Sequence, residues 1–200
     1  MPRINAENLA AHRTLMEGRL LDALGELLHE RGYDAITLAD VAARAGMARN
    51  SVYGYAADKQ ALLMAYVDRS VARFVADTRE EMADAVDAPA RLRILVRRQM
   101  AQFRAEPGAG GDGGMLDGAA LGPEGHGRLM TRFRPLHALL REVVDEGVST
   151  GAFRTVDVDE AVRLVFACLG AERVPVGSGE VTPEVAEARV ADFVLHALEA

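Results

Sequence analysis

The chain has 200 residues, half of them hydrophobic, and a formal net charge of −7 with histidine neutral. This length allows one large domain, or a small domain joined to a larger one, with enough apolar residues for a core. The acidic balance argues against a protein that coats nucleic acid broadly. The single cysteine, Cys168, excludes an internal disulfide and suits a reducing compartment.

The sequence has no apolar run of about eighteen residues, so no membrane span and no membrane partner are expected. Its first residues also lack the uninterrupted apolar stretch of a secretion signal. We therefore expect a cytoplasmic protein.

Residues 1–10 are predicted to form a loose arm, with a DNA contact by Arg3 as the alternative. A first helix is predicted from about Ala11 to Arg31, and Gly32 ends it. Leucines recur along this segment at helical spacing and form one apolar stripe: Leu20, Leu21, Leu24, Leu27 and Leu28.

The stretch from Thr37 to Lys59 has the pattern of a helix-turn-helix. The Thr37 hydroxyl can cap a helix over residues 38–45, and Gly46 permits the sharp turn that follows. A second short helix is predicted from about Ala48 to Tyr53. For steric reasons, a helix-turn-helix needs a small residue, then a glycine and then a buried branched residue, and the sequence has this order.

The exposed side of the second short helix carries hydrogen-bonding side chains. Arg49 and Asn50 can make two-pronged contacts with base edges, and the hydroxyls of Ser51 and Tyr53 suit phosphates or bases. Lys59 follows Asp58 at the start of the next helix, where it could clamp a phosphate. A plain helical hairpin inside an all-helical core is the alternative reading of this pattern.

The charges are divided unevenly along the chain. Residues 1–66 carry 7 basic and 8 acidic side chains, whereas residues 67–200 carry 16 and 22. DNA binding would therefore depend on a local cluster rather than on overall charge. The candidate members of that cluster are Arg44, Arg49 and Lys59, with Arg3 or Arg13.

Helices are predicted over the rest of the chain, at about 58–86, 89–105 and 124–146, then from Asp157 or Asp159, and from Thr182 with Pro183. One or two helical turns are expected at 115–121, and a turn at 174–181. The glycines at 108, 110 and 113 match a dinucleotide-binding fingerprint, but an arginine-rich helix precedes them instead of a strand, so a loop is expected. We expect no strand and an all-α fold of about nine helices.

The segment from Leu20 to Tyr66 resembles the DNA-binding domain of TetR-family transcriptional regulators. The resemblance rests on Glu30-Arg31-Gly32-Tyr33-Asp34, on the Thr-led helix with its Ala-Gly turn, and on the run from Tyr53 through Tyr55 and Lys59 to Leu62. The sequence departs from the family pattern at Ala56, where phenylalanine is usual, and at Asn50 and Ala39. The departure at Ala56 bears on local packing. The departures at Asn50 and Ala39 bear on which operator sequence is recognised.

A second phrase, between Leu136 and Gly170, resembles the family's second domain. It consists of a long helix, Gly147-x-x-x-Gly151-x-Phe153-Arg154, then Val156-Asp157-x-Asp159-Glu160-Ala161 and another long helix. The resemblance implies a three-helix DNA-binding domain at 1–57 and a helical ligand-binding and dimerisation domain at 58–200. It also implies a homodimer through the last two helices.

The chemistry of the side chains predicts a role for each candidate residue. Arg49, Asn50 and Ser51 are expected to face bases, and Thr37, Tyr53, Tyr55 and Lys59 to face phosphates. The helices of the second domain would enclose a small-molecule effector, and methionine and phenylalanine suit varied apolar ligands. Candidate lining residues are Gln99, Met100, Phe103, Met115, Met130, Phe133, His137 and Phe166, although each could be plain core.

The expected function is that of a ligand-responsive regulator, most simply a repressor that binds a palindromic operator as a dimer and is released by its effector. The alternative is a helical ligand- or partner-binding module that no longer binds DNA. No nucleophile or metal-binding motif is found, and the five histidines are scattered. We expect no enzymatic activity, no cofactor and no metal.

Overall fold

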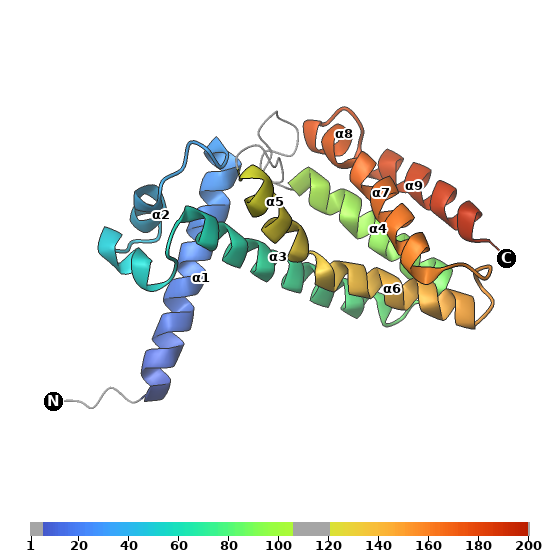
Figure 1. Ribbon diagram of the computed structural model, residues 1–200, viewed down its shortest axis with the longest axis horizontal. Helices are drawn as coiled ribbons and strands as arrows, with labels where there is room; N and C mark the ends of the chain where they lie inside the picture. The colour runs from blue at the N-terminus through green and yellow to red at the C-terminus, as the bar shows by residue number, and fades with distance from the viewer. Residues whose placement is uncertain (1–5, 106–120, 200) are drawn as a thin grey trace.

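A computed structural model describes residues 6–105 and 121–199, and within these ranges all regular structure is helical. The predicted all-α fold is confirmed (Figure 1). The amino-terminal part, here called the head, contains α1 (Ala6–Arg31), α2 (Leu38–Arg44), the 3-10 helix η1 (Arg49–Gly54) and the start of α3 (Lys59–Met82).

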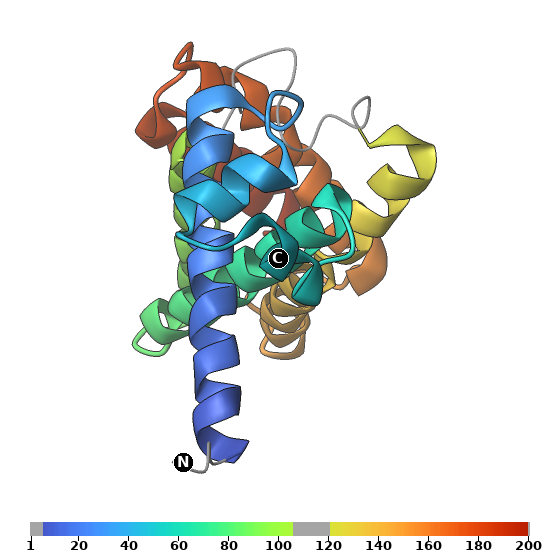
Figure 2. The ribbon, with the colours of Figure 1, turned by 90° about the vertical axis from the view of Figure 1, so that its left-hand side faces the viewer.

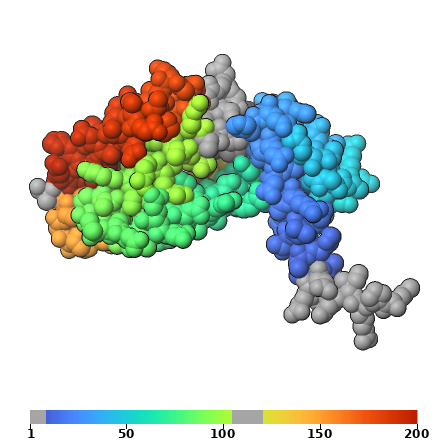
Figure 3. All heavy atoms as spheres, turned by 180° about the vertical axis from the view of Figure 1, so that it is seen from behind, coloured from blue at the N-terminus to red at the C-terminus, as the bar shows by residue number. Residues whose placement is uncertain are grey.

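The remaining helices form a larger body. They are α4 (Ala88–Ala105), α5 (Gly122–Thr131), α6 (Arg134–Ser149), α7 (Val158–Ala171), α8 (Arg173–Ser178) and α9 (Pro183–Leu198). Helix α4 lies at the centre of the body, where it packs against α6, α8 and α9. Helix α3 runs from the head along α4 and α6, and seen from behind it joins the two parts (Figures 1 and 3).

The apolar side chains gather in two cores. The head core is built on the predicted leucine stripe of α1, from Leu20 to Leu28, together with Val41, Val52 and the first half of α3. The body core unites α4, α6, α7 and α9 around residues such as Leu95 and Leu140. The division into 1–57 and 58–200 remains a prediction, because α3 contributes side chains to both cores.

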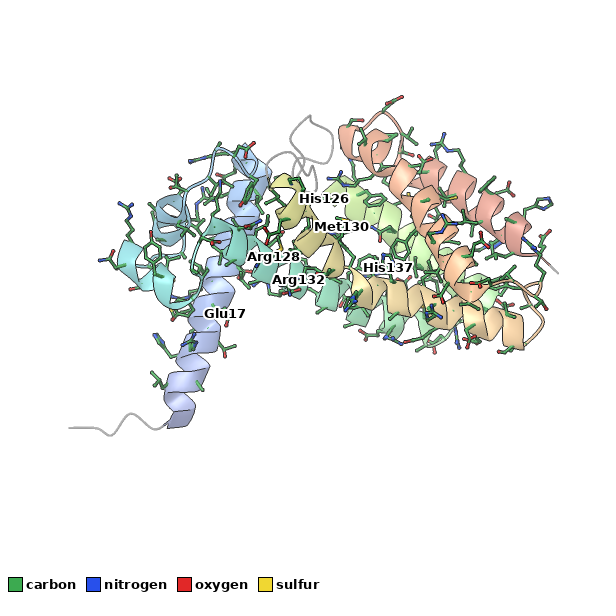
Figure 4. All side chains as sticks on the ribbon, viewed as in Figure 1. Glu17, His126, Arg128, Met130, Arg132 and His137 are labelled. Atoms are coloured by element: carbon green, nitrogen blue, oxygen red, sulfur yellow. The ribbon has the colours of Figure 1, made fainter. Side chains whose placement is uncertain are left out.

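Helix α5 crosses this division. Leu129 is fully buried and belongs to the head core, and Leu121 and Phe133 pack against the same core. The Arg132 side chain also binds Asp68 of α3, with Nη1 to Oδ2 at 2.9 Å. Figure 4 shows Arg132 on the side of α5 turned toward α3, and His126 and Met130 on the side turned toward α4. The head core is therefore completed by a segment more than fifty residues beyond the helix-turn-helix.

Helix α1 begins earlier than predicted. The loose arm was expected to reach residue 10, but the helix already starts at Ala6. Its first half extends beyond the rest of the head (Figure 2). The prediction for Arg3, and those for the glycine-rich loop and for Met115, lie outside the described residues.

The single helix predicted at 124–146 is wrong, because α5 and α6 are separate helices that meet at Arg132 and Phe133. Pro135 explains the break: it has no N–H to donate, and its ring would collide with the preceding turn of a continuous helix. At the start of α6 the same proline costs nothing, since the first N–H groups of a helix have no partner within it.

Two further boundaries differ from the predictions. Helix α3 ends at Met82 rather than near 86, because the chain turns there so that α4 can pack back against α3. Asp87 then caps α4 by accepting a hydrogen bond from the Ala90 N–H at 2.8 Å. The predicted turn at 174–181 is partly helical, because α8 precedes the left-handed Gly179.

None of the helices in the described ranges combines the length and the apolar character needed to cross a membrane.

Candidate nucleic-acid interface

Helix α2 is held at its start by the predicted cap. The Thr37 hydroxyl accepts a hydrogen bond from the Asp40 N–H at 3.2 Å, and the Asp40 carboxylate accepts from the Thr37 N–H at 2.8 Å. This reciprocal arrangement satisfies two N–H groups at once. The hydroxyl of Thr37 also donates to Asp40 at 2.6 Å, and together these bonds hold the pKa of the Asp40 carboxyl below its ordinary value of 3.8.

The turn after α2 has the geometry that the sequence predicted. Gly46 has φ +68°, in the left-handed region that costs glycine little, and the Met47 N–H returns to the Ala42 carbonyl at 2.8 Å. Ala42 and Val41 are buried beneath the turn. The second short helix is present one residue later than predicted, as the 3-10 helix η1, and Val52 anchors it in the head core.

The side chains predicted to contact bases lie on the outside of η1. Arg49, Asn50 and Ser51 are exposed, and Tyr53 is 53% exposed, whereas Val52 between them is fully buried. Arg49 takes part in none of the ion pairs found among the described residues. Helices α2 and η1 form the outer end of the head, beside the long α1 (Figure 2). Hydrogen-bonding groups on a short element with a buried anchor are suited to reading a groove of DNA.

Arg13 of α1 contacts the end of η1. Its Nη2 donates to the Gly54 carbonyl at 3.2 Å, and its guanidinium lies 5.6 Å from the centre of the Tyr55 ring. A cation near the carboxyl end of a short helix satisfies a free carbonyl. The sequence suggested Arg13 only as an alternative member of the basic cluster, because 41 residues separate it from Gly54 and local spacing carries no signal for the contact.

Lys59 has a structural partner in the head. Its Nζ donates to the Tyr33 carbonyl at 2.9 Å and lies 4.1 Å from the centre of the Tyr33 ring. Burial, followed by the charges of Asp58 and Asp34, raises the pKa of the Tyr33 hydroxyl. Asp58 caps α3 by accepting from the Ala61 N–H at 2.7 Å. Two of the three ammonium protons remain for a phosphate.

Arg44 is bound within the protein. It lies 3.0 Å from Glu26 and 2.7 Å from Glu30, both on α1. The hydrogen bonds that Arg44 donates to these carboxylates raise the pKa of its guanidinium, and the bonds to Glu30 lower the pKa of the Glu30 carboxyl. Its charge is therefore locally neutralised, whereas Arg49 is exposed on η1.

The residues predicted to line an effector site do not form one cluster. Gln99, Met100 and Phe103 are buried in the body, and the Gln99 Oε1 atom has no hydrogen-bond partner. Met130 is 41% exposed, and Phe133 packs against the head core. His137 and Phe166 lie together on the outside of α6 and α7, where their rings stack at 3.8 Å. Within the described ranges, no group of acidic, histidine or cysteine side chains is arranged to hold a metal ion.

Comparisons with known proteins point to one family. Residues 20–66 match the family of bacterial regulatory proteins described as the tetR family. An uncharacterised HTH-type transcriptional regulator of Mycobacterium tuberculosis, Rv1255c, is 32% identical over 100 residues, which is 50% of each chain. The match thus spans half the length of that relative. YdeS of Bacillus subtilis, an uncharacterised regulator of the same type, is 26% identical over 90% of this chain and 86% of its own.

A solved structure has the same fold over nearly the whole chain. The transcriptional regulator FadR from Bacillus subtilis, in complex with stearoyl-CoA, superposes with a TM-score of 0.76 at 18% identity. The superposition covers 90% of this chain and 98% of FadR.

Proposed function

Since this chain is a member of the TetR family of bacterial regulatory proteins, we propose that it represses transcription by binding a palindromic operator as a homodimer. In this proposal a small-molecule effector releases it from DNA. The protein would act in the cytoplasm, where it meets the operator.

The observation that carries the proposal is the exposed face of η1. Arg49, Asn50 and Ser51 would contact base edges in the major groove, because their side chains are free of the core while Val52 fixes their backbone. Thr37, Tyr53, Tyr55 and Lys59 would contact phosphates, which position the helix without reading sequence.

The homodimer would form through α7 and α9, the two long helices at the end of the chain. An apolar groove of about 520 Å³ lies between them. Leu164 and Phe193 line it and are 50% and 64% exposed. Large apolar side chains left in water on adjacent helices favour burial against a second copy. Two heads related by a twofold axis would then read the two halves of a palindrome.

The effector would act by shifting the population of two states. A ligand that binds better to a state with wrongly spaced heads lowers the fraction able to hold the operator. The Oε1 atom of the buried Gln99 in the body has no hydrogen-bond partner, and this supports a polar contact with a ligand. The stearoyl-CoA complex of the Bacillus subtilis FadR supports the idea that a body of this fold can hold a small molecule.

The proposal is tested by selecting binding sites from random duplex DNA with the purified full-length protein, at two salt concentrations. We expect an enriched inverted repeat and an affinity that falls as salt rises. Enrichment of a single half-site would contradict dimeric binding. The absence of enrichment at both salt concentrations would favour the alternative, a ligand- or partner-binding module without DNA affinity.

A further inference from the structure

A second groove on the body shares no lining residue with the groove between α7 and α9. It runs between α6 and α7, has a volume of about 420 Å³, and is lined by side chains of both helices. His137 sits on α6, on the side turned toward α7 (Figure 4). The side chains that matter for its chemistry are Arg134, His137, Arg141, Asp159, Arg163 and Phe166.

The charge of this groove is opposite to that of its surroundings. Three arginines line it, against one carboxylate, that of Asp159. Residues 67–200 otherwise carry an acidic excess, with 16 basic and 22 acidic side chains. Arg141 forms an ion pair with Asp159 and neutralises the carboxylate that would repel an anion. A local basic site in an acidic domain attracts an anion without attracting nucleic acid broadly.

Two of the arginines can turn toward a ligand at small cost. Arg163 meets Glu160 at 3.5 Å, and both side chains are more than 60% exposed, so this pair adds little stability. Arg134 takes part in none of the ion pairs found among the described residues of α6 and α7. A guanidinium binds a carboxylate, sulfonate or phosphate through two parallel N–H donors.

The groove also has an aromatic side. The His137 ring stacks on Phe166 with centroids 3.8 Å apart and planes at 11°. Burial lowers the pKa of His137 and so favours the neutral imidazole. Stacked aromatic rings favour contact with another planar ring.

We propose that the groove binds a planar aromatic anion, with Arg134 and Arg163 holding the anionic group and His137 with Phe166 contacting the ring. Its assignment as an effector site rests on the proposed function. Arg134 opens α6 immediately after Phe133, which packs against the head core, and α5 places Leu129 within that core. A ligand in the groove therefore acts on a segment that is continuous with the packing of the head.

Calorimetric titration of the full-length protein tests the site with two matched probes, naphthalene-2-sulfonate and the neutral 2-naphthol. We expect the sulfonate to bind the unmodified protein about tenfold more tightly, because only it can use the charged donors. In Arg134→Gln/Arg163→Gln this preference falls to within about twofold. Phe166→Ala weakens both probes. Arg73→Gln/Arg93→Gln removes two exposed arginines of α3 and α4 and keeps the preference.

Equal binding of the two probes, or a preference that survives in Arg134→Gln/Arg163→Gln, would overturn the site. Binding to the selected operator is measured on the same samples without probe, and we expect the groove variants to retain it. Retained operator binding without an anion preference overturns this inference alone. An anion preference without any operator binding overturns the proposed function and the effector role.

Discussion

At the scale of single residues, the cations of the head divide into those with internal partners and those without. Arg44 binds Glu26 and Glu30 on α1, and Lys59 binds the Tyr33 carbonyl. Both side chains therefore hold the helix-turn-helix against neighbouring segments. Arg49 is exposed on η1 and is the cation best placed to reach a base.

We expect Arg49→Ala to lower discrimination at the base that it reads by about 1–3 kcal/mol, because a two-pronged contact is lost. Competition between the selected site and its single-base variants measures this. Arg93→Ala, an exposed arginine of α4, serves as the control. A uniform loss of affinity across all sequences would instead indicate that Arg49 contacts phosphate.

Lys59→Ala is expected to weaken all sequences about equally and to reduce the salt slope of binding by about one, because one phosphate contact is lost. Affinity is measured across a series of salt concentrations. Because Lys59 also binds the Tyr33 carbonyl, a loss of affinity alone does not identify a phosphate contact, whereas a change in the salt slope does. A variant with weaker binding and an unchanged slope would show that Lys59 acts only by holding the head together.

The cap of α2 gives stability a defined pH dependence. Hydrogen bonds from Thr37 hold the pKa of Asp40 below 3.8 in the folded state, so their contribution is present above pH 3.8 and is lost as the pH falls through the folded value. We expect the stability difference between the unmodified protein and Asp40→Asn to be present at pH 7 and to shrink below pH 3.8. Urea unfolding at pH 7, 5 and 3 measures it, with Asp84→Asn as the control. A difference that is constant with pH would contradict this role.

At the scale of elements, the end of α6 packs closely against the residues that follow it. Gly147 near the end of α6 accepts a hydrogen bond from the Phe153 N–H at 2.9 Å. A Cβ at this position would overlap the Phe153 ring, which is buried in the body core. Position 147 therefore requires glycine because a larger side chain would not fit. Gly151, just after the helix, is favoured for a different reason: its φ of +75° lies in the left-handed region that costs glycine little.

We expect Gly147→Ala to lower the free energy of unfolding by about 1–3 kcal/mol through overpacking. Gly170→Ala is the matched control, because it also lies in a helix but has open space around it. That control should leave stability unchanged or raise it by up to about 1 kcal/mol, since alanine favours the helix. Chemical denaturation measures both, and equal effects would show that the Phe153 ring moves aside freely.

At the scale of the whole molecule, we propose that a second copy of the chain covers the exposed apolar side chains of α7 and α9. We expect Leu164→Arg/Phe193→Arg to convert the protein to a monomer, because two charges would be placed in the interface. Light scattering after size-exclusion chromatography measures the mass, and affinity for the inverted repeat should fall with it.

Val86→Arg is the control for the dimer, since Val86 is 90% exposed in the turn between α3 and α4. It should leave mass and affinity unchanged. A dimer that persists in Leu164→Arg/Phe193→Arg would place the interface elsewhere.

The sequence by itself determined the features that depend on residues three or four positions apart. The Thr37–Asp40 cap, the left-handed Gly46 and the leucine stripe of α1 are of this kind, and each is present. Such features follow from helix periodicity and from local hydrogen bonding. They were sufficient to predict the fold class and to select the exposed residues of η1.

Tertiary structure alone decided which partners these residues have. Arg44 pairs with carboxylates 14 and 18 residues away, Lys59 with a carbonyl 26 away, and Arg13 with one 41 away. The packing of Leu129 into the head and the groove that His137 and Phe166 share between α6 and α7 are of the same kind. Periodicity identifies which face of a helix is apolar. Which other helix covers that face depends on how the whole chain packs.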